Sequence, residues 1–390
     1  MFSLELCIQQ DENTLLVLIY CIAMRQFRPV FLQNLLKEFC SQMKEFMILY
    51  RQRAIENHRK QEEDTMKIAM ISGWHVHAKG YARQALEIPG VEIKTVWDED
   101  PQRGKKWAEE LGCDFVADYD EIMADEEIDG VVIDAPSSMH ADLMIRAAKA
   151  GKHIFTEKVL TLEVEDAEAV RDAIHENGVR FVISFPHRTR RDLLFVKKLA
   201  EEGILGTLSY ARVHNCHNGS SADWLPPFFY DATQTGGGAM VDLGAHGMYL
   251  LPWLLGEPLT VQSTFTQASG RGVEDNAVSV LTFPGGAIGI SETGFIHSND
   301  PMTIELVGTK GTVIVRGNEP VKLCGECTDG IWKEVLESDL PVALPSAMQQ
   351  FVNAFELEMG SLFDIDDAVA LTKVMKAAYK AAETGHVTEI

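Results

Sequence analysis

Short apolar runs alternate with amphipathic segments in the part of the chain that begins at Met66. Such runs are typical of strands buried on both faces. They predict strands at 67–72, 92–97, 131–135, 154–156 and 180–184. The segments between them carry helix signals: Asp100 before Pro101 reads as an N-cap, Thr161 is expected to cap a later helix, and glycines close the helices near Gly90 and at Gly112, Gly151 and Gly178. The alternation predicts an α/β unit, a Rossmann-type parallel sheet domain over residues 66–185.

The pattern changes after Phe185, where a helix to about Gly203 and a second helix starting at the glycines 236–238 are followed by alternating apolar and polar positions. These positions predict strands at 260–268, 276–283, 287–292, 303–308 and 312–316, and two closing helices at 346–359 and 366–383. We expect residues 186–390 to form an α+β domain with an open, mostly antiparallel sheet, used for substrate binding and oligomerisation. The active site should lie in the cleft between the two domains.

Residues 1–65 differ from the rest. Their basic and acidic side chains nearly balance, so almost all of the net charge of −23 falls on residues 66–390. The codons of Gln61, Glu62 and Glu63 can spell a purine-rich bacterial ribosome-binding site at a suitable distance before the Met66 codon. This suggests a translated leader and a mis-set start. The alternative is a genuine amphipathic extension, since apolar residues between Leu32 and Tyr50 recur at helical spacing.

Charge and cysteine content narrow the class of protein. A net charge of −23 disfavours nucleic acid and anionic membranes as partners. Seven scattered cysteines form no disulfide framework and suit a reducing cytoplasm, and Cys324 and Cys327 are expected to be plain thiols. The apolar run from Leu15 to Met24 is too short to span a bilayer. We expect a soluble, cytoplasmic protein.

The segment GWHVHAKGYA follows the first predicted strand, where a dinucleotide-binding fold keeps its phosphate loop. Gly73 and Ala78 fit the first and third positions of the glycine fingerprint, but His75 occupies the second. The amides of the following helix can still favour a phosphate. His75 and His77 either bind phosphate or substrate, or merely pack the loop. Asp98 ends the second strand, where an acid hydrogen-bonds the adenosine ribose and favours NAD over NADP.

Five stretches occur together in one order: GVVIDAPSSMH (130–140), GKHIFTEKV (151–159), GGGAMVDLGAHGMYLLPWLLG (236–256), VGTKGTV (307–313) and FDIDDAVALTKVMKAAYKAAETG (363–385). Together they resemble the Gfo/Idh/MocA oxidoreductases, the family of glucose-fructose oxidoreductase and inositol dehydrogenase. The resemblance covers Met66 to Ile390 and implies NAD(P)-dependent hydride transfer at a hydroxyl carbon of a sugar, polyol or glycoside. It also implies two alternatives: redox-neutral cleavage or elimination with transient NAD oxidation, and a non-catalytic sensor of NAD and sugar.

The resemblance assigns catalytic roles to Lys158, Asp242 and His246. Lys158 resembles the lysine of the family's Glu-Lys-Pro motif, with Val159 in place of proline, and its ammonium would hold the reacting oxygen. On a helix beginning at the triple glycine, Asp242 and His246 share one face, so that His246 could take the hydroxyl proton while Asp242 fixes its tautomer. The alternatives for His246 are a buried core histidine or half of a zinc site.

The remaining expectations concern binding. The predicted cofactor contacts are Gly73, Trp74, His75, Val76, Asp98, Arg103, Ala135, Pro136, His140 and Glu157, and the predicted substrate contacts are His187, Arg188, His214 and Tyr230. His214, Cys216 and His217 make a metal conceivable, but a ligand set from one short segment is incomplete, so no metal is predicted. A homodimer or homotetramer is expected through the uncovered face of the second sheet, which includes strand 287–292.

Overall fold

The computed structural model describes residues 65–356 and 362–390, and residues 66–390 form one compact unit. The prediction of a mis-set start concerns residues that, apart from Thr65, lie outside the described part. In the described ranges, no helix is long and apolar enough to cross a membrane.

The first sheet is parallel throughout and has the strand order β3-β2-β1-β4-β5-β6. Its strands are β1 (Met66–Ile71), β2 (Val91–Trp97), β3 (Asp114–Phe115), β4 (Gly130–Ile133), β5 (His153–Thr156) and β6 (Phe181–Ile183). Every residue of β4 is buried, as are all of β1 except Lys67, because helices cover both faces. The Rossmann-type sheet expected from the apolar runs is confirmed, with β3 as an additional strand.

The helices of this region are α3 (Ala78–Leu86), α4 (Pro101–Leu111), α5 (Tyr119–Ala124), α6 (His140–Lys149) and α7 (Val164–Asn177). Asp100 caps α4 as predicted, since its carboxylate accepts the backbone N–H groups of Gln102 and Arg103. The cap expected from Thr161 is wrong. The N-cap of α7 is Glu163, and the Thr161 hydroxyl donates instead to the Glu163 carbonyl at 2.8 Å.

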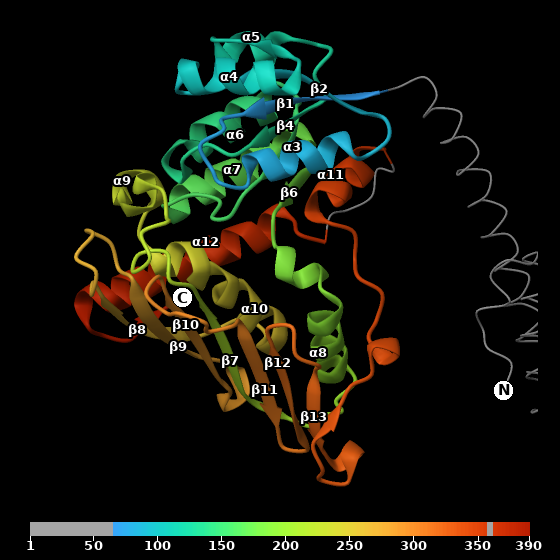
Figure 1. The fold of residues 1–390 in the computed structure, drawn as a ribbon, viewed down its shortest axis with the longest axis vertical. Helices are drawn as coiled ribbons and strands as arrows, with labels where there is room; N and C mark the ends of the chain where they lie inside the picture. Colours follow the sequence, from blue (N-terminus) through green and yellow to red (C-terminus); the bar gives the residue numbers. More distant parts are fainter. Residues whose placement is uncertain (1–64, 357–361) are drawn as a thin grey trace, which may run out of the picture. The chain divides into compact units, whose positions relative to one another are not determined.

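The second sheet has the order β14-β13-β12-β11-β7-β10-β9-β8-β15. Its strands are β7 (Leu208–Cys216), β8 (Thr260–Thr266), β9 (Asn276–Thr282), β10 (Ile288–Gly294), β11 (Thr303–Gly308), β12 (Gly311–Arg316), β13 (Lys322–Gly325), β14 (Lys333–Glu334) and β15 (Thr388–Glu389). All neighbours are antiparallel except β7 and β10, which run parallel at its centre. The mostly antiparallel sheet is therefore confirmed (Figure 1).

Four helices complete the fold: α8 (Arg191–Glu201), α10 (Ala245–Leu255), α11 (Ala347–Glu356) and α12 (Ile365–Thr384), with the short α9 (Ala232–Thr235) before the glycines. Helix α10 packs on β7 and β10, so one face of the second sheet is covered. Helix α11 packs on β5 and β6 of the first sheet, and α12 contacts both α7 and β8 (Figure 1). The end of the chain thus returns to the Rossmann sheet. A domain boundary at residue 185 assigns α11 to the second domain, although this helix packs on the first sheet.

Candidate functional site

The loop between β1 and α3 has the features of a phosphate-binding turn. Ser72 has a positive φ of 70°, and the backbone N–H of Gly73 donates to the Asp98 carboxylate at 2.9 Å. A Cβ on Gly73 would lie 3.0 Å from the Trp107 ring. The backbone N–H of His75 donates to the Asp134 carbonyl at 3.1 Å, so the histidine in the middle of the loop is held by the neighbouring strand end.

The N-terminus of α3 is open to an anion. His77 occupies the N-cap position without a side-chain cap, and the first turn contains no acidic residue. The positive end of the helix dipole and its free amides therefore favour a phosphate at this place. These features fit the pyrophosphate of a dinucleotide, although the middle glycine of the fingerprint is replaced. Val76 is exposed at the tip of the same turn.

Asp98 was expected to hydrogen-bond the adenosine ribose. In the structure its carboxylate does not face an open site. It is fully buried and accepts hydrogen bonds from the backbone of Gly73 and Asp100 and from the Arg103 guanidinium. Arg103, whose side chain is 33% exposed, also pairs with Glu99. Asp98 thus fixes the loop, and the guanidinium of Arg103 is the group that reaches the surface.

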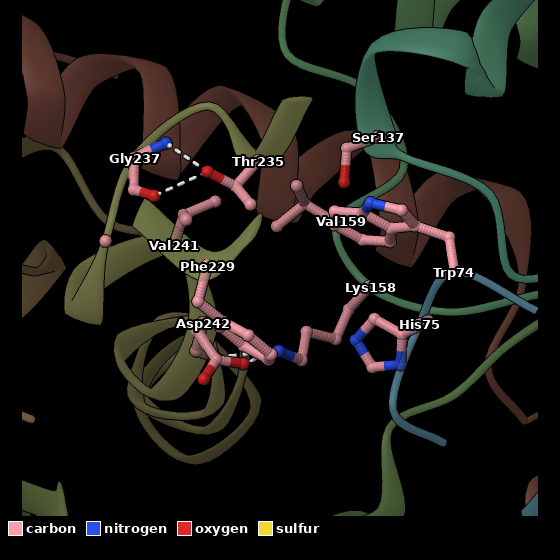
Figure 2. Close-up of a pocket in the computed structure, with 11 residues that line it drawn as sticks. Trp74, His75, Ser137, Lys158, Val159, Phe229, Thr235, Gly237, Val241 and Asp242 are labelled. Atoms are coloured by element: carbon pink, nitrogen blue, oxygen red, sulfur yellow. Dashed lines mark hydrogen bonds and ion pairs between the residues drawn. The ribbon is translucent and has the colours of Figure 1, made fainter. Parts of the chain in front are cut away.

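Lys158 and Asp242 form a buried ion pair at a pocket between the two sheets. Lys158 Nζ lies 2.8 Å from Asp242 Oδ1 and 2.9 Å from the Asp242 carbonyl oxygen. Figure 2 shows the lysine extended toward Asp242 with the His75 ring beside it. The pocket is lined by Trp74, His75, Ser137, Lys158, Val159, Phe229, Thr235, Gly237, Gly238, Val241 and Asp242.

Charges around the pair hold it ionised. Burial opposes the ammonium of Lys158, but the carboxylates of Asp242 and Glu157 outweigh burial and raise the pKa of the lysine. Burial likewise opposes the carboxylate of Asp242, yet Lys158 lowers its pKa. The pocket therefore contains a fixed ammonium that can donate a hydrogen bond to a substrate oxygen.

Glu157 lies beneath this lysine. Its Oε2 accepts the backbone N–H of Lys158 at 2.9 Å, and its Oε1 lies 2.7 Å from His77 Nδ1 and accepts the Tyr81 hydroxyl. Burial raises the pKa of a carboxyl group, but His75, His77 and Lys158 reverse this and lower the pKa of Glu157. Glu157 was expected to bind cofactor; in the structure it positions the lysine and the loop.

His246 is separated from Asp242 by a change in the helix. The expected α-helix from the triple glycine begins instead with a π-helical turn, Met240–Gly244, before α10. The wider turn rotates Asp242 relative to His246, so the carboxylate pairs with Lys158 and His246 Nδ1 lies 2.9 Å from the Tyr249 hydroxyl. Burial, followed by the charges of His187 and Lys158, lowers the pKa of His246 well below 6.5. The imidazole is neutral at neutral pH.

The four residues predicted to contact substrate lie in separate surroundings. His187 packs edge-on against His246, with ring centroids 4.5 Å apart. Arg188 is buried and pairs with Asp367 at 2.8 Å, His214 lies between Glu292 and Asp300, and Tyr230 packs under Arg271. Within the described residues, none of these four side chains lines the pocket with Lys158, and neither does His246.

The turn after β4 is built around His140. His140 Nε2 lies 2.9 Å from the Ala135 carbonyl oxygen, and Nδ1 lies 3.0 Å from the Leu160 carbonyl oxygen. The histidine therefore fastens the turn of Ala135 and Pro136 to the segment that carries Lys158, where its family motif had suggested contact with the cofactor. Trp74, also a predicted cofactor contact, lines the pocket and donates from Nε1 to Gln234.

Several site residues were missed by the sequence argument. Tyr249 and Tyr81 provide hydroxyl partners for His246 and Glu157, and Phe229 and Thr235 line the pocket. Tyr249 could have been found, because it follows His246 by three residues on one helix face. Phe229 and Thr235 lie in short helical turns, Pro227–Tyr230 and α9, which are too short to show a periodic pattern in the sequence.

Comparison with known proteins identifies the family of both domains. Residues 66–185 match the oxidoreductase family with an NAD-binding Rossmann fold, and residues 193–314 match the GFO/IDH/MocA C-terminal domain. The chain is 28% identical over 250 residues to scyllo-inositol 2-dehydrogenase (NAD(+)) of Bacillus subtilis, covering 62% of this chain and 70% of that protein. It is 26% identical over 327 residues to 1,5-anhydro-D-fructose reductase of Ensifer adhaerens, covering 80% of this chain and 95% of the relative.

Solved structures show the same fold. The crystal structure of GenD2 from gentamicin A biosynthesis in complex with NAD has a TM-score of 0.72 and 26% identity, covering 84% of this chain and 97% of that one. Levoglucosan dehydrogenase in complex with NADH and levoglucosan has a TM-score of 0.73 at 19% identity, covering 83% of this chain and 99% of that one. With its Rossmann sheet and two matched domains, the chain belongs to the Gfo/Idh/MocA family of NAD-binding oxidoreductases.

Proposed function

We propose that the protein transfers a hydride between NAD and a hydroxyl carbon of a sugar, polyol or glycoside. The buried Lys158–Asp242 pair carries this proposal, because it holds a charged ammonium in a pocket beside the phosphate turn. Relatives named as inositol and levoglucosan dehydrogenases support the substrate class.

The residues divide the chemistry among themselves. The turn at Gly73–His75 and the N-terminus of α3 would hold the pyrophosphate, and NAD when bound supplies the hydride acceptor at its nicotinamide. Lys158 donates a hydrogen bond to the substrate oxygen and stabilises its developing charge. His246, neutral because its pKa is lowered, accepts the hydroxyl proton, and Tyr249 at 2.9 Å fixes the orientation of the ring. Asp242 acts through Lys158, which it keeps charged.

The experiment is a screen of sugars and polyols with NAD, in which absorbance of the reduced nicotinamide and substrate conversion are both followed. Reduction of NAD with oxidation of one hydroxyl is the expected result. Conversion of a glycoside without net NADH would assign the redox-neutral reaction instead. Binding of NAD and sugar without reduction or conversion of any compound would show that the protein is a sensor.

We also infer that chains associate through the face of the second sheet opposite α10. Val278, Val280 and Ile288 are 39%, 37% and 42% exposed on neighbouring strands of this face, a concentration of branched apolar side chains that a partner chain would cover. Light scattering at micromolar concentration should give a dimer or tetramer, and Val280→Lys should shift it toward the monomer. A monomeric native chain would contradict this.

The four free cysteines of the described residues are consistent with the reducing cytoplasm.

A further inference from the structure

Three side chains that can bind a metal, two histidines and a cysteine, meet at one end of the second sheet, on the face opposite α10. His214 and Cys216 lie on β7, and His297 lies in the segment between β10 and β11. One ligand atom from each residue lies within 4.8 Å of the other two. The parallel pairing of β7 and β10 places Cys216 opposite Gly294, so both strands deliver their ends to the same place.

A carboxylate lies beside the two histidines of this group. Asp300 Oδ2 is 2.7 Å from His214 Nε2 and 3.4 Å from His297 Nδ1. The sequence had suggested His217 as the companion of His214 and Cys216. In the structure His217 stacks on Phe295, with ring centroids 4.9 Å apart, and the positions it was expected to fill are taken by His297 and Asp300.

The outer nitrogen of each histidine already has an oxygen acceptor. His214 Nδ1 lies 3.0 Å from Glu292 Oε2, and His297 Nε2 lies 3.4 Å from Asn276 Oδ1. When the outer nitrogens carry the hydrogens, both inner nitrogens present lone pairs toward the same Asp300 oxygen. Lone pairs and a carboxylate repel one another unless a cation lies between them. Metal-binding histidines commonly donate their other N–H to a carboxylate or carbonyl in this manner.

The surroundings hold the group in place. His214 is buried, and Glu292 is itself fixed by an ion pair with Arg212. Arg212, His214 and Cys216 alternate along β7 with Ala211 and Val213, whose side chains are buried in the core on the other face. The group is therefore rigid on the strand side and closed by the loop that carries His297 and Asp300.

We propose that His214, Cys216, His297 and Asp300 bind a zinc ion. Imidazole, thiolate and carboxylate donors are the ligands that zinc takes in proteins, and four protein ligands make a closed, structural site. Such an ion would join the loop after β10 to the end of β7. In the described part of the chain these residues do not line the pocket of Lys158, so the proposal is independent of the proposed function.

Metal content of the full-length protein tests this proposal. After removal of metals with a chelator and addition of zinc, elemental analysis should give one zinc per chain. Cobalt(II) in place of zinc should give the strong near-ultraviolet absorption of a thiolate–cobalt bond. Cys216→Ser should abolish this absorption, and Asp300→Asn, in an exposed loop, should weaken cobalt binding. Glu292→Gln should keep the absorption but weaken binding by about tenfold, the effect expected of a residue that orients a ligand.

Cys324→Ser and Cys327→Ser are the matched controls, because both thiols lie outside the group and their loss should leave the absorption unchanged. Circular dichroism of each variant checks that it is folded. A native chain that binds no zinc or cobalt overturns the proposal, and so does absorption that persists in Cys216→Ser. Binding that is lost only in His77→Ala would assign the metal to the second group of ligands, His75, His77 and Glu157, and would also overturn it.

Discussion

Removal of the Lys158 ammonium should slow hydride transfer by roughly two to three orders of magnitude, the loss typical of one group that stabilises a developing oxyanion. Lys158→Met keeps most of the apolar stem of the side chain and removes the ammonium, with its charge and its hydrogen bonds. The lysine makes two contacts with Asp242, at 2.8 and 2.9 Å, and its side chain is 3% exposed. A methionine cannot reproduce either contact.

The same change should also destabilise the fold. Two unit charges 2.8 Å apart attract by about 6 kcal/mol at an effective dielectric constant of about 20. Much of this attraction offsets the cost of burying the ions, but removing one partner leaves Asp242 in the pocket without its cation. We expect the free energy of unfolding to fall by about 3 kcal/mol.

Lys152→Met separates the two effects. Counted over the whole residue, Lys152 and Lys158 are both 6% exposed. Lys152 Nζ donates to the carbonyl oxygens of Asp125 and Ile128 at 2.6 and 2.8 Å, away from the pocket. Its loss should lower stability, measured by urea unfolding, while kcat stays within about threefold of the native value. NAD affinity, measured by fluorescence titration, should change little in either variant. Lys158→Met with native kcat, or with kcat reduced no more than in Lys152→Met, would refute the assignment.

Three further predictions concern the Rossmann domain and the pocket. Arg103→Ala should increase the preference for NAD over NADP in binding titrations. The change removes the cation that a 2′-phosphate would need and exposes the carboxylates of Asp98 and Glu99. An unchanged ratio of the two dissociation constants would contradict this. Gly104→Ala should lower the free energy of unfolding, measured with urea, by about 1–3 kcal/mol, since the new Cβ would lie 2.6 Å from both Asp98 Cβ and the Phe115 ring. Gly80→Ala is the control, because no atom lies within 4 Å of its new Cβ, and it should be neutral or stabilising. Burial lowers the pKa of His75 and His187 from 6.5 to about 4, and it also lowers the pKa of His246 well below 6.5. At these histidines the unfolded chain therefore binds more protons than the folded chain below pH 6.5, and the free energy of unfolding should fall as the pH drops from 6.5 toward 4. Constant stability over this range would show that these histidines are not buried in their neutral form.

Local sequence patterns were sufficient to predict the fold class, because buried strands and helix caps each produce a recognisable pattern within a few residues. The apolar run at 67–72 became β1, and Asp100 with Pro101 begins α4 as predicted. The short strands β13, β14 and β15 were missed, since segments of this length with mixed exposure carry too little periodicity. The cap of α7 was misplaced because Thr161 has a side chain typical of an N-cap, whereas the helix begins after Glu163, whose side chain makes no capping hydrogen bond.

The sequence by itself determined the family and the residue types at the site, since Lys158, Asp242 and His246 lie in motifs that can be recognised in order along the chain. The tertiary structure decided their partners. A π-helical turn assigns Asp242 to Lys158 and leaves Tyr249 as the partner of His246. The same is true of His214 and Asp300, which are 86 residues apart in sequence and 2.7 Å apart in space. Side-chain partners of this kind depend on how the sheets and loops pack, and no local pattern in the sequence encodes that packing.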